Sequence, residues 1–138
     1  MTRKPKLIGI VAATALAGAT VLADLATAHD KAFSNSVTLT EANRLGPAVG
    51  AYGGRVLSAN PRCPRVREVQ VYRADVTPEV RLFTTRTTPG GRWRRKGPAL
   101  PDGAKVYALI ETKVLRSSAA HDHVCRVDRS PVRTIPYP

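Results

Sequence analysis

Few side chains in this 138-residue sequence could do chemistry, and the two cysteines, Cys63 and Cys125, come first. Two thiolates cannot complete the four-ligand site that structural zinc requires, and no CxxC spacing occurs. In an oxidising compartment, two cysteines form a disulfide by default. If the chain is exported, we therefore expect a bond between Cys63 and Cys125 that joins an early loop to a late strand.

The histidines form the second group, and they fall in two places: His29, and the pair His121 and His123. If export removes the residues before it, His29 offers both its imidazole and a free α-amine. Imidazole suits Cu(II) in a square-planar set of nitrogen and oxygen ligands. One hypothesis is therefore a copper site made of His29, His121 and His123. The alternative is three exposed histidines that bind nothing.

The third group is the densest basic cluster, which runs from Arg92 to Lys96 around Trp93, the only tryptophan. On a strand, Arg92, Arg94 and Lys96 would share one face, and Arg95 would take the other with Trp93. Such groups can hold phosphate or carboxylate oxygens, so these four residues are candidates for polyanion binding. The alternative is a solvated strand face whose charges discourage edge pairing. We expect Trp93 to anchor the core rather than to form an exposed stacking platform.

The sequence carries no recognisable catalytic set. It holds no G-x-S-x-G element, no phosphate-binding loop and no zinc-ligand spacing. Asp122 precedes His123, but adjacency in sequence does not orient an acid toward a base and a nucleophile. Nothing selects two of the carboxylates for glycoside hydrolysis. We therefore expect a protein that is not an enzyme and needs no cofactor.

Residues 1–28 have the parts of a helical secretory signal peptide. Basic residues precede an apolar run of small residues, Leu7–Ala23, and an Ala-x-Ala motif ends at Ala28. Cleavage would follow Ala28, and a second acceptable site follows Ala23. An uncleaved membrane anchor is the alternative, although the apolar run is at the short limit for a span. The sequence thus predicts a secreted or cell-surface protein that meets the membrane only through this segment.

The formal net charge of +12 dominates the composition. Such an excess attracts polyanions, among them anionic wall polymers, acidic glycans, lipid headgroups and stray nucleic acid. The alternative is that the excess reflects only an arginine-rich composition. The charge would then affect association and solubility without forming a specific site. We expect no specific nucleic-acid partner.

Alternating apolar and polar residues, separated by turn residues, predict short strands that would position these side chains. Residues 29–50 are expected to form an extension with a short first strand at 36–40 and one helical turn at 41–45. Residues 51–138 are expected to form one disulfide-stabilised β-sandwich. Its expected strands are 51–58, 67–73, 80–85, 92–94, 105–115, and a last one at 123–128 and 132–135 that Pro131 interrupts.

Three of these segments carry more detailed expectations. Residues 80–85 and 92–94 indicate a hairpin closed by a Pro-Gly-Gly turn. The most apolar segment, 105–115, indicates a central strand, with a helix as the alternative on length alone. Paired glycines at 53 and 54 indicate a bulge or a close backbone contact.

An ordered set of short motifs resembles transthyretin-like (prealbumin-like) domains, in the carboxypeptidase-regulatory and Cna B-type branch found in secreted bacterial proteins. The motifs are Gly54–Ser58, Val69–Tyr72, Thr87–Trp93, Leu100–Gly103 and Val106–Ala108. The resemblance implies a seven-stranded Greek-key β-sandwich with a structural or adhesive role. Cna B-type domains often carry a lysine isopeptide crosslink, but Arg55 stands in place of that lysine. Because arginine cannot form that bond, we expect no isopeptide crosslink here. By analogy with the family, the Cys63–Cys125 disulfide would be the substitute crosslink.

These observations together predict a secreted, monomeric, non-enzymatic β-sandwich with a structural or binding role toward anionic or carbohydrate polymers. Two alternatives remain open: an adaptor or inhibitor-type domain for one partner protein, and a copper-binding sandwich. The salt dependence of the affinity distinguishes the first two possibilities. Added salt screens exposed charges, so it should weaken polymer binding steeply but leave a packed protein interface largely unaffected.

Overall fold

The protein is all-β over the residues that its computed structural model describes, 30–117 and 122–136. No helix occurs in these ranges, so none there is long and apolar enough to cross a membrane. The predicted signal segment, 1–28, lies outside them. The strands are β1 (Lys31–Phe33), β2 (Asn35–Arg44), β3 (Val49–Ser58), β4 (Glu68–Arg73), β5 (Val80–Arg86), β6 (Arg92–Pro98), β7 (Lys105–Ile110), β8 (Lys113–Ser117), β9 (Asp122–Cys125), β10 (Asp128–Arg129) and β11 (Arg133–Thr134).

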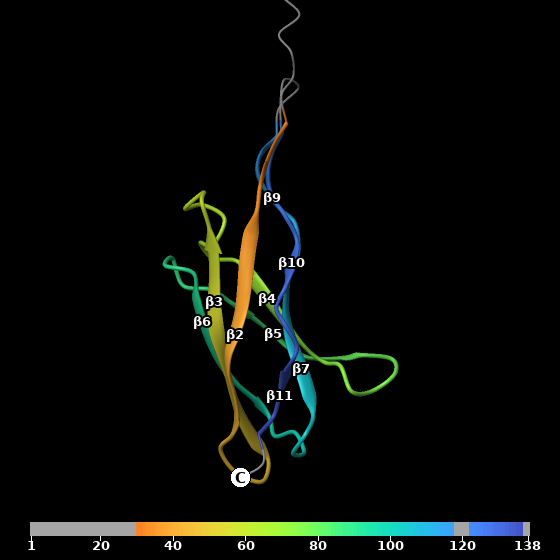
Figure 1. The fold of residues 1–138 in the computed structure, drawn as a ribbon. Coiled ribbons are helices and arrows are strands. Elements are labelled where there is room, and N and C mark those ends of the chain that lie inside the picture. Colours follow the sequence, from red (N-terminus) through yellow and green to blue (C-terminus); the bar gives the residue numbers. More distant parts are fainter. Residues whose placement is uncertain (1–29, 118–121, 137–138) are drawn as a thin grey trace, which may run out of the picture.

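Two antiparallel sheets form the two layers of the molecule (Figure 1). In the first, which we call the β3 sheet, β3 lies between β2 and β6. In the second, the β4 sheet, the order is β5-β4-β7, with β10 and β11 both paired to the far side of β7. The layers also meet at one edge, where the Val37 N–H donates to a carboxylate oxygen of Asp128 at 2.7 Å. The arrangement is consistent with a β-sandwich.

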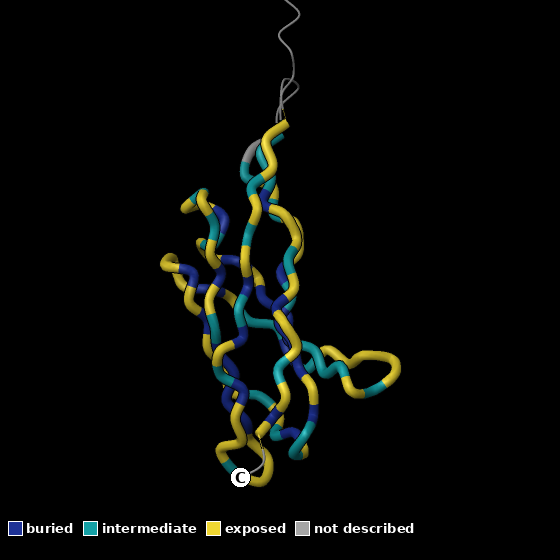
Figure 2. Tube along the Cα trace, viewed as in Figure 1, coloured by how far each residue is buried: buried dark blue, intermediate teal, exposed yellow. Residues whose placement is uncertain are grey.

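The core fills the space between the two sheets. Its largest members come from both layers, as the buried segments in Figure 2 indicate. The core residues are Val37, Leu39, Ala42, Tyr52, Val56, Val69, Val71, Phe83, Trp93, Leu100, Ala104, Val106, Ala108, Ile110 and Ile135. Trp93 is 3% exposed, which confirms that it is a core anchor.

A small third sheet lies at one end of the sandwich. β1 runs parallel to β9, and β8 runs antiparallel to β9 on its other side. The Arg126 N–H donates to the Phe33 carbonyl at 2.9 Å, which continues the contact beyond β9. The N-terminal segment is therefore tied to a late part of the chain.

The segment expected as an extension is part of the sandwich. β2 pairs with β3 along its whole length and contributes Val37, Leu39 and Ala42 to the core. The predicted helical turn at 41–45 is wrong, because residues 41–44 continue this strand. The pairing register shifts between Leu39 and Glu41, so apolar spacing changes there from two residues to three. That irregular spacing concealed the strand.

The predicted hairpin between 80–85 and 92–94 is also wrong. The turn itself forms, since the Gly91 N–H donates to the Thr88 carbonyl at 2.9 Å. However, β5 pairs with β4, and β6 pairs with β3 in the other sheet. The chain changes layers at this turn, and Phe83 and Trp93 thereby enter the core from opposite sheets.

The apolar segment 105–115 is two strands rather than one. β7 is central in the β4 sheet, as predicted, but β8 begins after a break at residues 111–112 and belongs to the small end sheet. The last segment is broken at Pro131 as expected, with β10 and β11 pairing separately with β7. The same predicted strand also supplies β9, and β1 was not predicted, so the described residues form eleven short strands where the sequence predicted seven.

Candidate anion-binding face

The outer side of β3 and β6 carries the predicted basic cluster. Arg92, Arg94 and Lys96 alternate with inward residues along β6, and all three are exposed. The register adds a fourth cation, because Arg55 on β3 lies directly opposite Arg92. We call these four residues, Arg55, Arg92, Arg94 and Lys96, the basic face. Arg55 was missed as a candidate because the pairing of β3 with β6 is not visible in the sequence.

Small residues of β3 form the floor of this face. Ala51 lies opposite Lys96 and Gly53 opposite Arg94, and both are buried although they point away from the core. A Cβ on Gly53 would stand 3.1 Å from a Glu41 carboxylate oxygen and 3.4 Å from the Arg94 Cγ. The missing side chain leaves room for the Glu41–Arg94 ion pair, 2.9 Å long, to pass over β3. One of the four cations is therefore already paired.

Arg95 does not belong to the basic face. As the strand alternation predicted, it points to the other side of β6. Its guanidinium donates to the Thr84 carbonyl and lies 5.4 Å from the centre of the Phe83 ring. Arg95 therefore covers an edge of the core next to β5.

Two clefts open onto the basic face. One is lined by Leu45, Ala51, Arg94, Arg95 and Lys96. The other is lined by Thr40, Gly54, Arg55, Thr88, Arg92, Trp93 and Arg94. The second holds three arginines and two hydroxyl groups, of which Arg94 is paired with Glu41 and the Thr40 hydroxyl donates to the Gly53 carbonyl at 3.4 Å. The groups left to donate to an oxyanion are Arg55, Arg92 and Thr88. We call this second cleft the arginine cleft.

Trp93 borders the arginine cleft from below. Its indole N–H is buried and finds no hydrogen-bond acceptor in the described part of the chain. A Cβ on Gly54 would come within 3.1 Å of the Trp93 Cε2, the ring carbon bonded to that nitrogen. Because Gly54 has no side chain, only its backbone lies between the Trp93 ring and the cleft.

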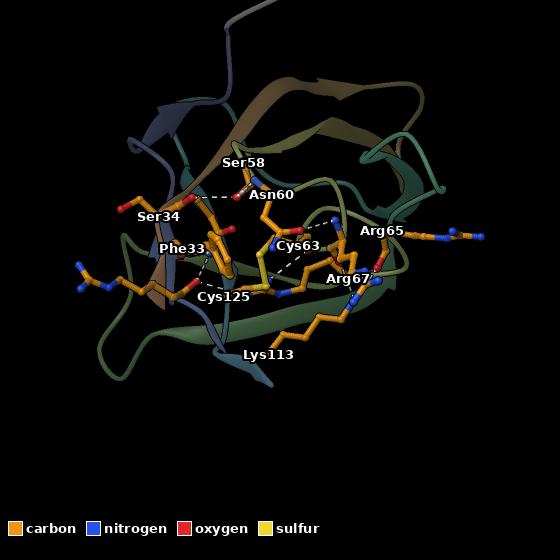
Figure 3. The surroundings of a disulfide bond; sticks show 12 residues. Phe33, Ser34, Ser58, Asn60, Cys63, Arg65, Arg67, Lys113 and Cys125 are labelled. Carbon is orange, nitrogen blue, oxygen red and sulfur yellow. Dashed lines mark hydrogen bonds between the residues drawn. A yellow bond between two sulfur atoms is a disulfide. The ribbon is translucent and has the colours of Figure 1, made fainter. Parts of the chain in front are cut away.

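The Cys63–Cys125 disulfide forms as predicted and is fully buried (Figure 3). It joins the loop after β3 to the end of β9, with a Cα–Cα distance of 5.6 Å. Arg67, 3% exposed, lies beside it and donates to the carbonyls of Cys63, Glu111 and Arg126. Burial lowers the pKa of this guanidinium. The disulfide and the buried arginine together fix this end of the domain.

Lys113 binds the same loop from β8. Its ammonium donates to the Arg65 carbonyl at 2.7 Å and to the Arg62 carbonyl at 3.1 Å. Burial, followed by the nearby positive charges of Arg67 and Arg65, lowers the pKa of Lys113. These interactions use backbone carbonyls, and in Figure 3 the Arg65 side chain points away from the disulfide. The role of this cluster is structural.

The outer side of the β4 sheet has a different chemistry. Glu68 and Glu111 line a pocket there, and the Gln70 amide donates to both carboxylates, at 3.2 and 3.4 Å. Tyr72 donates to the other end of the same amide and stacks on Tyr107 with ring centres 5.3 Å apart. Because one buried amide holds both carboxylates, we assign this pair a structural role. That the protein is not an enzyme stays a prediction.

The predicted copper ligands are His29, His121 and His123. His29 and His121 lie outside the described residues. His123 is on β9, where its ring meets that of Phe33 edge-on at 6.2 Å. Within the described ranges, no three histidine, cysteine or acidic side chains converge as metal ligands would. The copper site therefore stays a prediction.

Comparison with known proteins gives no relative. No protein-family model matches the chain, and neither the curated proteins nor the solved structures contain a match to it. What the structure supports is an all-β protein with a disulfide, compatible with a β-sandwich.

Proposed function

We propose that this chain is an extracellular β-sandwich domain, without catalytic activity, that binds an anionic polymer through the basic face. The observation that carries the proposal is the surplus of positive charge there. Arg94 is neutralised by Glu41, whereas the side chains of Arg55, Arg92 and Lys96 have no partner in the described part of the chain. Exposed cations without carboxylate partners can each take an anion from solution.

The spacing of these cations favours a polymer over a small ligand. Arg92 and Lys96 are four residues apart on β6, which corresponds to roughly 14 Å along an extended strand. A single small anion cannot contact both groups, but a chain with repeated charges can. Each exposed contact is weak, so useful affinity requires several of them at once.

Other observations support the proposed fold family and the proposed extracellular location. The motif order favours a transthyretin-like Greek-key sandwich, and the predicted signal segment favours export. The buried disulfide supports an oxidising compartment, because such bonds are rare where thiols are kept reduced. Anionic polymers of the cell surface are the targets such a protein would meet.

Binding to immobilised polyphosphate, with uncharged dextran as the comparison, tests the proposal. We expect binding to polyphosphate alone, with an affinity that falls steeply as salt is added. The triple variant R55Q/R92Q/K96Q should bind at least ten-fold more weakly. The control R62Q/R65Q/R81Q removes the same charge from exposed side chains elsewhere and should bind almost as well as the parent. Equal losses in the two triples would show that net charge alone is responsible, and binding that salt leaves unchanged would favour a protein partner.

A further inference from the structure

Arg55 and Arg92 are two like charges at facing positions of neighbouring strands. They lie opposite each other on the antiparallel strands β3 and β6. The backbone N–H of Arg55 points toward β2, where it donates to the Thr38 hydroxyl at 3.0 Å. The N–H of Val56, the next residue, donates toward β6, to the Gly91 carbonyl at 2.8 Å. Arg55 and Arg92 are therefore a non-hydrogen-bonded pair, the type in which facing side chains are closest.

This pairing is unfavourable for the free protein. Cβ atoms of directly opposed residues stand about 4.5–5.5 Å apart, and like charges on such facing side chains are destabilising. Glu41, the acid on the neighbouring strand β2, is paired with Arg94 at 2.9 Å. An anion placed between the two guanidinium groups would turn the repulsion into two attractive contacts.

The surroundings of the pair supply a further donor. Thr88, in the same cleft, accepts a hydrogen bond from the Arg92 backbone N–H at 3.2 Å, so its own hydroxyl proton can point elsewhere. The Trp93 ring lies behind the Gly54 backbone at the same cleft, so it reports on the cleft without donating to it. Donors therefore approach this one cleft from two strands and from the turn between β5 and β6.

We propose that the arginine cleft is a seat for a phosphate group, held between Arg55 and Arg92, on an extracellular phosphodiester polymer. This inference rests on the proposed function and names the ligand chemistry. Two guanidinium forks on neighbouring strands, with a hydroxyl beside them, meet an anion from different directions. A phosphodiester has two unesterified oxygens that accept hydrogen bonds from directions all around the P–O axis, whereas a carboxylate accepts chiefly in its own plane. Phosphate therefore fits the donor set better than a carboxylate.

Calorimetric titration of the exported protein with poly(glycerol phosphate), and with polyglutamate of matched charge, tests the seat. We expect poly(glycerol phosphate) to bind at least ten-fold more tightly. R55Q and R92Q should each remove most of this preference, while K96Q should weaken binding of both polymers only about two-fold. R81Q, which removes an exposed arginine from the other sheet, should leave both affinities unchanged.

A second readout comes from Trp93, the only tryptophan. Glycerol 3-phosphate should change its fluorescence in the parent and in K96Q, but not in R55Q. Because R55Q removes a repulsion, its melting temperature should equal or exceed that of the parent, which separates lost binding from lost folding. Equal affinity for the two polymers, or equal effects of R55Q and K96Q, would overturn the phosphate seat and leave general polyanion binding intact. No binding of either polymer would overturn both.

Discussion

The guanidinium of Arg67 donates to the backbone carbonyl of Cys63 at 3.2 Å, although the arginine is almost fully buried. The same guanidinium donates at 3.1 Å to the carbonyl of Arg126, the residue after Cys125. One side chain thus bonds to the backbone on both sides of the disulfide. The two crosslinks, one covalent and one polar, hold the same pair of segments, and they make separate contributions to stability.

The covalent crosslink should supply a large part of that stability. The disulfide closes a loop with a sequence separation of 62 residues, for which the chain-entropy estimate is roughly 4 kcal/mol. We expect the double variant C63A/C125A to lose about that much free energy of unfolding in urea denaturation. Reduction of the parent should give a similar loss, which controls for the substituted side chains. A loss below about 1 kcal/mol in both cases would contradict the prediction.

The polar crosslink should depend on the shape of arginine as well as on its charge. Replacing Arg67 with methionine leaves three backbone carbonyls without their donor, at a cost of about 2–3 kcal/mol. Lysine keeps the charge but lacks the fork that reaches all three, so R67K should lose an intermediate amount. Urea denaturation measures both, with R65M, an exposed arginine two residues earlier, as the near-neutral control. If R67M and R65M were equally stable, the buried contacts would have no energetic role.

Gly54 should tolerate no larger residue. A Cβ at this position would lie 1.9 Å from the Thr38 carbonyl oxygen, and neither backbone can move without separating β2 from β3. We expect G54A to lose about 3 kcal/mol or more, or to fail to fold. Gly46, where a Cβ would meet nothing within 4 Å, is the matched control, and G46A should change stability by less than about 0.5 kcal/mol. Thermal melts of the two variants compare them directly.

Local sequence patterns were sufficient for features that depend on near neighbours. Val69 and Val71 alternate with polar residues, and both are fully buried on β4, as period-two patterning predicts. The glycines at 53 and 54 predicted a close backbone contact, which the Thr38 carbonyl supplies. The disulfide followed from there being two cysteines and an expected export signal.

Features that depend on distant partners could not be predicted in this way. The turn at Thr88–Gly91 has local hairpin chemistry, but whether β5 pairs with β6 is decided by where Phe83 and Trp93 find space in the core. The basic face has the same limitation. Arg55 meets Arg92, and Glu41 meets Arg94, only because β6, which is far along the chain from β2 and β3, pairs with β3 in this register.

Tyr107 should make stability depend on pH in the alkaline range. Burial, followed by its hydrogen bond to the Glu79 carboxylate, raises the pKa of this phenol to about 12 from an ordinary value of 10.0. The folded state therefore holds the phenolic proton more tightly than the unfolded state does. The resulting stabilisation is complete below pH 10 and is lost as the pH rises through about 12.

Melting temperatures of the parent and of Y107F, measured from pH 9 to pH 12, test this prediction. The raised pKa of the buried Tyr52 affects both proteins, so both should become less stable as the pH rises. The parent should fall more steeply between pH 10 and pH 12, because only it must ionise Tyr107 beside Glu79. At pH 7 the parent should be more stable than Y107F, since Y107F lacks the hydrogen bond to Glu79. Parallel curves over the whole range would show that Tyr107 ionises equally easily in the folded and the unfolded protein.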